Sequence, residues 1–168
     1  GATFEGNSTY NGLGQGFWIT ATGTGNTFVD DTVVKCSSDG VYITADTCTF
    51  TNLRVDTAGG LGFKLEGAIG NTLTNCRTYR PNGYGVYLFG GSNTNTLTNC
   101  AAHATRANDG IKVENSNANQ LTGCTVASSA SSGFALVGTS SCLYNRLTNC
   151  VATADAGSAY WIECETAT

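Results

Sequence analysis

The 168-residue chain contains no methionine, one proline and one histidine, His103. Charged residues make up only 12% of it, and its net charge is −4. A nucleic-acid partner would require a basic face, which this composition does not supply. No apolar run approaches the length of a membrane span, so no transmembrane segment is expected. The length suits one domain, covering residues 1–168.

The eight cysteines lack any Cys-x-x-Cys spacing, and a single histidine accompanies them. A zinc site is therefore not expected, and nothing indicates another metal or a cofactor. An even number of cysteines is compatible with an oxidising compartment. We therefore expect the protein to be extracellular or exposed on a cell or virion surface.

The sequence is rich in repetition. One word recurs as GNTLTNC (70–76), TNTLTNC (94–100), ANQLTGC (118–124) and YNRLTNC (144–150). Weaker copies extend the series, so that its central apolar residue returns every 22–26 residues: Phe4, Phe28, Phe50, Leu73, Leu97, Leu121 and Leu147. A fixed period of this length is typical of solenoids and propellers.

A second repeated motif, which we call the second word, occurs once after each copy of the first. Its copies are GFWI (16–19), GVYI (40–43), GFKL (62–65), GVYL (85–88), GIKV (110–113), GFAL (133–136) and AYWI (159–162). Apolar and variable residues alternate in it, which indicates a strand with one buried face. A Gly, Asn or Asp residue lies two positions after the central residue of each first word. These residue types tolerate the left-handed backbone of a sharp bend. A third strand is expected after this bend.

Each unit thus holds three short strands, and no segment shows a helical period of useful length. Like strands of successive units would stack in parallel, about 4.8 Å apart. A propeller fits poorly, because each blade needs four strands and roughly 40 residues. The sequence therefore predicts an all-β fold: a parallel β-helix, or solenoid, of about seven coils of 22–26 residues each.

Four cysteines occupy one position of successive coils: Cys76, Cys100, Cys124 and Cys150. We expect a column of small buried thiols there. Disulfides between neighbouring coils are the alternative, because the strand spacing lies within the permitted Cα separation. Cys142 and Cys164 lie near corresponding points of successive coils and are a candidate disulfide. The repeat pattern assigns no role to Cys36 or Cys48.

The words G-apolar-x-apolar and N-x-L-x-N resemble those of the right-handed parallel β-helix superfamily. This group includes pectate lyases, alginate epimerases, phage tailspikes and non-catalytic carbohydrate-binding repeats. The resemblance covers all the coils and implies the fold, although a fold alone assigns no activity. It also implies that a sugar would lie across the outer face of the strand that carries the G-apolar-x-apolar word.

On that face, aromatic residues alternate with lysine and glutamate along two adjacent columns of outward positions. Such a surface suits stacking on sugar rings with polar anchors. The expected carbohydrate-binding residues are Trp18, Tyr42, Lys64, Tyr87, Phe89, Lys112 and Trp161. The alternative is purely structural, because outward strand positions favour aromatics and Lys–Glu pairs form surface ladders.

Catalytic candidates on this face are Glu66 and Glu114, which the strand spacing places roughly 9.6 Å apart. That distance is at the upper edge of the range for inverting glycosidases. Lys112, Asp109 and His103 lie nearby in the sequence. However, the chain lacks the dense aspartate cluster of hydrolases with this fold, the acidic calcium site of the lyases and the Asp-Pro-His-Glu motif of the epimerases.

Another face carries threonines in two columns: Thr3, Thr27, Thr49, Thr72 and Thr96, and Thr51, Thr74, Thr98, Thr122 and Thr148. Regular Thr-x-Thr arrays on a flat β-helix face resemble those of ice-binding proteins. Glu5, Val29, Gln120 and Arg146 interrupt the array, and threonine is a good strand former in any case. A packing or assembly face is therefore favoured, and ice binding is the third hypothesis.

Neither end of the sequence shows a polar cap, which solenoids normally need. The join from Ile162 to Phe4 of a following copy would take 10 residues, within the range of 7–11 for the same connection inside the chain. A second copy could therefore stack in register and produce an open rod or filament. The alternative is that the sequence was excised from a longer β-helix.

These observations favour a secreted or surface-exposed, non-catalytic structural or adhesive module. Its expected partners are further copies of itself, end to end or side by side, and a polysaccharide along the aromatic face. The alternative is a polysaccharide lyase, hydrolase or epimerase domain of the tailspike type.

Overall fold

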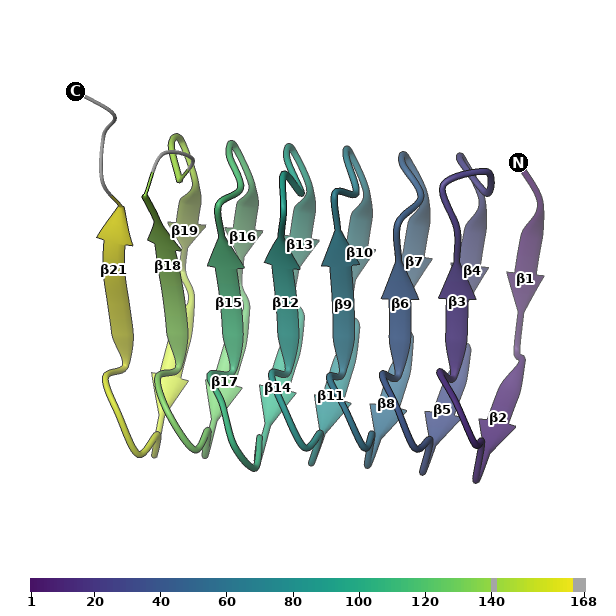
Figure 1. The fold of residues 1–168 in the computed structure, drawn as a ribbon, viewed down its shortest axis with the longest axis horizontal. Helices are drawn as coiled ribbons and strands as arrows, with labels where there is room; N and C mark the ends of the chain where they lie inside the picture. The colour runs from purple at the N-terminus through teal and green to yellow at the C-terminus, as the bar shows by residue number, and fades with distance from the viewer. Residues whose placement is uncertain (140–141, 165–168) are drawn as a thin grey trace.

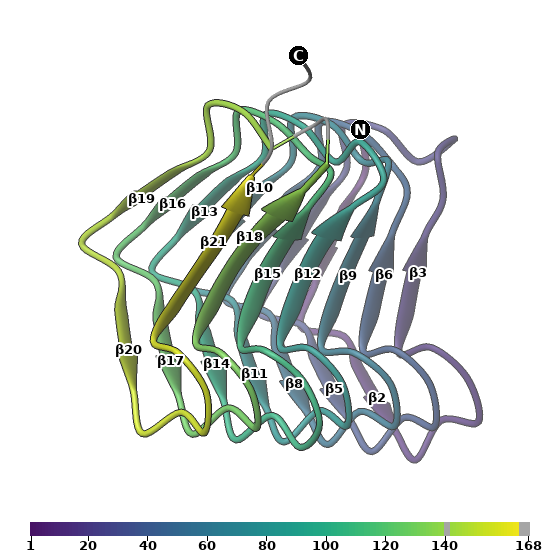
Figure 2. The ribbon, with the colours of Figure 1, turned by 60° about the vertical axis from the view of Figure 1, so that its left-hand side comes forward.

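The structure, a computed structural model, describes residues 1–139 and 142–164. Its 21 described strands form three parallel sheets of seven strands, and every coil contributes one strand to each sheet. Figure 1 shows the coils side by side, from the N-terminal coil at the right to the C-terminal coil at the left. Figure 2 shows that each coil has three sides. The predicted all-β solenoid of about seven coils is therefore confirmed.

Sheet 1 contains β1 (Thr3–Glu5), β4 (Thr27–Val29), β7 (Thr49–Thr51), β10 (Thr72–Thr74), β13 (Thr96–Thr98), β16 (Gln120–Thr122) and β19 (Arg146–Thr148). Sheet 2 contains β2 (Ser8–Tyr10), β5 (Thr32–Val34), β8 (Arg54–Asp56), β11 (Arg77–Tyr79), β14 (Ala101–His103), β17 (Thr125–Ala127) and β20 (Val151–Thr153). Sheet 3 contains β3 (Phe17–Ile19), β6 (Val41–Ile43), β9 (Phe63–Glu66), β12 (Val86–Phe89), β15 (Ile111–Glu114), β18 (Phe134–Gly138) and β21 (Tyr160–Cys164).

The strands pair in the register that the repeat predicts. Phe28 lies between Phe4 and Phe50 in sheet 1, and Leu73 lies between Phe50 and Leu97. The ring of Phe28 stacks on those of Phe4 and Phe50, with centroids 4.9 and 5.0 Å away. Phe50, Leu73 and Leu97 are completely buried. One apolar column therefore runs along the interior, as predicted.

The bend after each sheet 1 strand has the predicted left-handed backbone, at Gly6, Asp30, Asn52, Asn75, Asn99, Gly123 and Asn149. A second left-handed position, which the sequence did not indicate, follows each sheet 2 strand: Asn11, Lys35, Thr57, Arg80, Ala104, Ser128 and Ala154. At this position the backbone N–H donates to the next coil, as Thr57 does to the carbonyl of Tyr79 at 2.8 Å. Stacking between coils therefore holds the conformation.

An asparagine column in the turns from sheet 3 to sheet 1 was also not predicted. The side-chain oxygen of Asn95 accepts the backbone N–H of Asn71 at 2.8 Å, and that of Asn119 accepts the N–H of Asn95 at 2.9 Å. The amide nitrogen of Asn95 donates to the carbonyl of Ala68 at 2.8 Å. These side chains are completely buried, so the column supplies hydrogen bonds that the irregular turn backbone would otherwise lack.

The cysteine predictions are confirmed, except that Cys150 is only partly buried. The thiol of Cys100 donates to the carbonyl of Leu73, and that of Cys124 to the carbonyl of Leu97. Cys76 and Cys150 complete this column of free thiols. Cys142 and Cys164 form a disulfide between the last two coils. Two further free thiols, which had no predicted role, are buried: Cys36 and Cys48.

The two outermost coils expose residues that are buried elsewhere. Phe4 is 43% exposed and Ile162 is 66% exposed, whereas Phe50 and Leu65, at the same positions of an inner coil, are completely buried. The threonine columns of sheet 1 lie in the predicted register. In the described part of the chain, no helix is long and apolar enough to cross a membrane.

Candidate functional site

Along the strands of sheet 3, residues that point into the core alternate with residues on the outer face. Val86 and Leu88 of β12 point inward and are buried, while Tyr87 and Phe89 point outward. The parallel register places Lys64 and Lys112 on either side of Tyr87. The two outward columns predicted from the sequence therefore exist as one continuous surface.

The centre of this surface is a cluster of aromatic rings in the fourth coil. Tyr87 and Phe89 stack with centroids 4.5 Å apart and planes within 5°. Tyr84, from the turn before β12, tilts against Tyr87 with centroids 4.6 Å apart. Trp18 and Tyr42 form a second stacked pair, 6.1 Å apart, on β3 and β6. Flat, partly exposed rings of this kind can stack on the faces of sugar rings.

Lysines flank the central cluster. The Nζ atom of Lys64 lies 4.3 Å from the ring centroid of Tyr42 and 5.5 Å from that of Phe89. The Nζ atom of Lys112 lies 5.4 Å from the centroid of Tyr84 and 5.6 Å from that of Tyr87. All four distances are within the range of cation–π attraction, which helps to hold the ammonium groups over the aromatic surface.

Each lysine is also paired with the glutamate two residues further along its strand. Lys64 contacts Glu66 at 3.3 Å, and Lys112 contacts Glu114 at 2.8 Å. The hydroxyl of Tyr42 donates to Oε2 of Glu66 at 2.6 Å, and the hydroxyl of Tyr87 donates to Glu114. A Tyr–Glu–Lys group therefore occurs twice, two coils apart.

These contacts set the protonation of the groups. The hydroxyl of Tyr42, followed by Lys64, lowers the pKa of Glu66 below its usual value. Burial alone would raise the pKa of Glu114, but Lys112 and Tyr87 outweigh it and lower that pKa. The hydrogen bond to Glu66 raises the pKa of Tyr42 to about 12. At neutral pH both carboxylates are therefore ionised and Tyr42 is neutral.

The five catalytic candidates do not converge. Glu66, Lys112 and Glu114 share the outer face of sheet 3, whereas His103 lies on β14 of sheet 2. Asp109 is buried in the turn before β15, where its Oδ1 accepts the backbone N–H of Ser132 at 2.8 Å. Asp109 therefore joins two coils. Among residues 1–139 and 142–164, no group of His, Cys, Asp and Glu is arranged to hold a metal ion.

A shallow groove lies at the C-terminal part of the same face. Lys112 and Glu114 line one side of it, Trp161 and Glu163 line the other, and its volume is about 250 Å³. It is open because the intervening coil places the small residues Ala135 and Val137 at these positions. Sequence reasoning had not selected Glu163 or Tyr84, since Tyr84 stands in a variable turn outside the periodic strands.

Comparisons with known proteins agree with this architecture. The family described as "Right handed beta helix region" matches residues 39–168. No curated protein matches the sequence.

Three solved structures are similar in fold. The A-module of the Azotobacter vinelandii mannuronan C-5 epimerase AlgE4 superposes with a TM-score of 0.68 at 13% identity, covering 99% of this chain and 57% of that one. The periplasmic alginate epimerase AlgG has a TM-score of 0.59 at 12% identity, covering 89% and 47%. The catalytic domain of a GH87 α-1,3-glucanase, solved with tetrasaccharides, has a TM-score of 0.60 at 15% identity, covering 89% and 34%.

This chain therefore spans from about a third to just over half of each similar structure. At these identities the likeness shows the fold alone.

Proposed function

This chain belongs to the right-handed β-helix family, and we propose that it is the glycan-binding part of a polysaccharide-active protein. The observation that carries the proposal is the continuous outer face of sheet 3, where stacked aromatic rings alternate with paired lysines and glutamates. The similar structures, two epimerases and a glucanase, support the polysaccharide-active class over a purely structural one.

Each part of the surface has a distinct role in this proposal. Phe89 and Trp18 present ring faces to sugar rings, and the ionised carboxylates of Glu66 and Glu114 accept hydrogen bonds from sugar hydroxyls. Tyr42 and Tyr87 hold those carboxylates in place. Because the two Tyr–Glu–Lys groups lie two coils apart, or roughly 9.6 Å, a linear glycan running along the stack of coils can contact both.

The protonation states favour binding over acid–base catalysis by these carboxylates. An inverting glycosidase needs one carboxyl group protonated, with a raised pKa. The pKa values of both Glu66 and Glu114 are lowered instead. We therefore assign them as anchors for the glycan rather than as an acid–base pair.

A panel of soluble uronate and neutral glycans tests the proposal by isothermal titration calorimetry, with product release measured in parallel. Trp18→Ala and Phe89→Ala should each weaken binding of the preferred glycan roughly fivefold, the equivalent of about 1 kcal/mol for one aromatic contact. The control is Tyr144→Ala, which removes an 85% exposed aromatic outside sheet 3.

Affinity that is unchanged in both variants, or no binding across the panel, would overturn the proposal. Product release that survives Glu66→Gln and Glu114→Gln would show an enzyme whose catalytic site lies elsewhere.

We propose self-association, through the end-to-end stacking that the repeat spacing allows, as a second candidate function. A second copy stacked on either end would bury the exposed apolar residues there, such as Phe4 and Ile162. About three large apolar residues would contribute 5–9 kcal/mol, against an association cost of about 4–15 kcal/mol, so hydrogen bonds between coils must contribute as well.

Sedimentation velocity over a range of concentrations should show growing rods, and Ile162→Asp should abolish them. The matched control is Ile69→Asp, at a 44% exposed isoleucine of an inner coil. A monodisperse monomer at the highest concentration would count against this candidate.

A further inference from the structure

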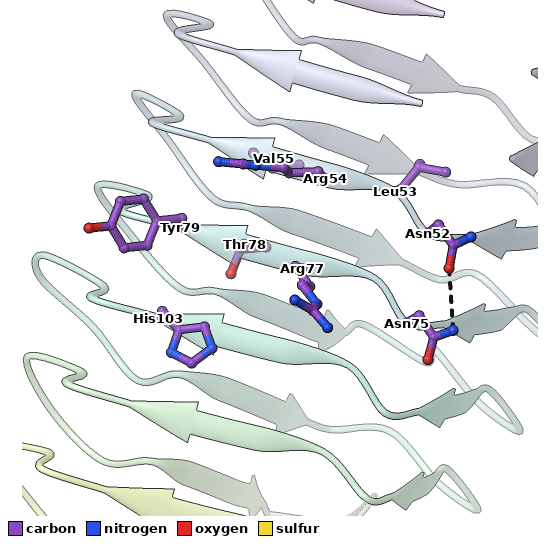
Figure 3. A pocket seen from close by; sticks show the side chains of 9 residues that line it. All are labelled: Asn52, Leu53, Arg54, Val55, Asn75, Arg77, Thr78, Tyr79 and His103. Atoms are coloured by element: carbon purple, nitrogen blue, oxygen red, sulfur yellow. Dashed lines mark hydrogen bonds between the residues drawn. The ribbon is translucent and has the colours of Figure 1, made fainter. Parts of the chain in front are cut away.

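A second groove lies on sheet 2, away from the aromatic face. Its volume is about 610 Å³, and it crosses three successive strands, β8, β11 and β14. Figure 3 shows the side chains of Arg54, Arg77 and His103 coming from these three strands, with Asn52 and Asn75 at one edge of the groove. Nothing in the proposed role of sheet 3 uses this groove.

Two arginines, Arg54 and Arg77, line this groove. The chain has eight lysines and arginines, and five of them lie on the sheet 2 strands or in the turns that follow: Lys35, Arg54, Arg77, Arg80 and Arg106. Asp56 is the single acidic residue on the described sheet 2 strands, and Asp39, Asp109 and Asp155 lie in the turns that follow them. The side chains that line the groove therefore include two arginines and no carboxylate, on a chain whose net charge is −4.

Two arginines face one another across the strands. Arg54 and Arg77 are direct partners in the register of β8 and β11, and like charges in such positions repel. Asp56 contacts Arg54 at 3.2 Å. In the described part of the chain, Arg77 has neither an ion pair nor a hydrogen bond from its side chain. One guanidinium group is therefore left without a counter-charge.

The space above Arg77 is open because its partner on β14 is Ala101, whose side chain is small. His103 and Tyr79 are direct partners two residues further along the strands. Tyr79 is 40% exposed, and the guanidinium of Arg80 lies 4.4 Å from its ring centroid. The groove thus combines an unpaired guanidinium, an aromatic ring, an imidazole and the amides of Asn52 and Asn75.

We propose that this groove is a second glycan site, which binds a sugar carrying a carboxylate group. The planar fork of Arg77 matches a carboxylate in geometry and charge. Tyr79 supplies a surface for the sugar ring, and the asparagine amides supply partners for hydroxyls. The site is separate from sheet 3, so it stands or falls independently of the function proposed above.

The test is calorimetric titration of the full chain with a short oligogalacturonate, against an uncharged oligoglucan of the same length. We expect binding of the acidic probe alone. Arg77→Ala should weaken it about tenfold, as loss of a charge-assisted hydrogen bond implies, and Arg77→Lys should restore part of the affinity. The control is Arg146→Ala, which removes an exposed arginine from an outward position of sheet 1.

Four results would overturn the proposal. One is equal binding of the neutral probe that Arg77→Ala weakens as well, and another is an equal loss of affinity in Arg146→Ala. The third is displacement of the probe by inorganic sulfate as readily as by unlabelled oligogalacturonate, because this would indicate a non-specific anion site. If Trp18→Ala weakens binding and Arg77→Ala does not, the acidic probe occupies sheet 3, which refutes this site and supports the other one.

Discussion

A single asparagine in this protein holds three successive turns together. The side-chain oxygen of Asn95 accepts the backbone N–H of Asn71, and its side-chain nitrogen donates to the carbonyl of Ala68. On the other side, the backbone N–H of Asn95 donates to the side-chain oxygen of Asn119. All of these groups are buried, so none can form a hydrogen bond with water instead if the side chain is lost. The amide group is therefore more important to the fold than its size suggests.

Asn95→Ala should lower the free energy of unfolding by about 2–4 kcal/mol, because it leaves several buried polar groups without partners. Asn99→Ala is the matched control. It changes an exposed asparagine with φ 53°, and should cost only about 1 kcal/mol for placing alanine in the left-handed region. Urea denaturation measures both. Similar losses in the two variants would contradict the role given to the buried column.

The Tyr42–Glu66 hydrogen bond leads to a prediction about the pKa of Glu66. Tyr42→Phe should raise the pKa of Glu66 toward its usual value, because the largest contribution to the lowered pKa is removed. Carboxyl-detected NMR follows this titration, and Tyr144→Phe should leave it unchanged. A Glu66 pKa that is identical in wild type and Tyr42→Phe would refute the contact.

The sign of the effect on stability follows from the same shifts. The lowered pKa of Glu66 contributes stability above the usual carboxyl pKa, and this is lost as the pH falls through the lowered value. The pKa of Tyr42 is raised to about 12, so its contribution is complete below pH 10 and is lost as the pH rises to about 12. Burial and the contact with Glu114 also raise the pKa of Tyr87, and burial raises that of Tyr160, so phenolate absorbance should show these three tyrosines titrating late.

At the scale of the element, the glycine that opens each second word has a packing reason. A Cβ atom on Gly85 would lie 2.4 Å from the Cβ atom of Ala102 in sheet 2 and 2.5 Å from the carbonyl oxygen of Gly110. The chain enters sheet 3 so close to sheet 2 and to the next coil that no side chain fits. This explains the repeated glycine, which the sequence showed but did not account for.

Gly85→Ala should therefore destabilise the protein by about 2–3 kcal/mol through overpacking. Gly90→Ala is the control, since nothing lies within 4 Å of its Cβ position and only its φ of +62° opposes alanine. That variant should cost about 1 kcal/mol. Thermal unfolding compares the two, and an equal shift in midpoint would argue against the close approach.

The three sheets share one backbone plan but differ in what they present outward. Sheet 1 presents threonines, sheet 2 presents Arg54, Arg77 and His103, and sheet 3 presents aromatic rings between lysine–glutamate pairs. Inward positions are constrained by the core, whereas outward positions are free to vary. Chemical function in this protein is therefore a property of individual faces.

At the scale of the whole molecule, each coil is stabilised by its neighbours, as in other solenoids. The last coil has a neighbour on one side only in this structure, and the Cys142–Cys164 disulfide ties it to the coil before it. The disulfide closes a loop with a sequence separation of 22 residues, for which the chain-entropy account gives about 3 kcal/mol.

Reduction, or Cys164→Ser, should therefore accelerate hydrogen exchange in β21 while leaving β12 and β9 unchanged. Cys76→Ser is the control for loss of a thiol, because Cys76 is free. Alkylation of the unfolded, unreduced chain should label six cysteines out of eight. Eight labelled cysteines, or exchange that rises equally in all coils, would contradict this assignment.

Much of the fold could be read from the chain alone. The 22–26 residue period, the alternation in the second word and the Gly, Asn or Asp at the first bend specify the coils, the register and the inward columns. The same periodicity placed Lys64, Tyr87 and Lys112 side by side and matched Cys142 to Cys164. These features follow from a local backbone pattern repeated at a constant interval, which a sequence displays directly.

Other features were decided only when the coils stacked. Thr57 and Arg80 adopt a left-handed backbone against their own preference, because hydrogen bonds to the next coil hold them there. Tyr84 contacts the aromatic surface from an irregular turn. His103 lies with Arg77 on sheet 2, whereas Glu114 lies on sheet 3. Contacts of this kind depend on how far each turn projects and on which sheet a strand joins, and packing in three dimensions sets both.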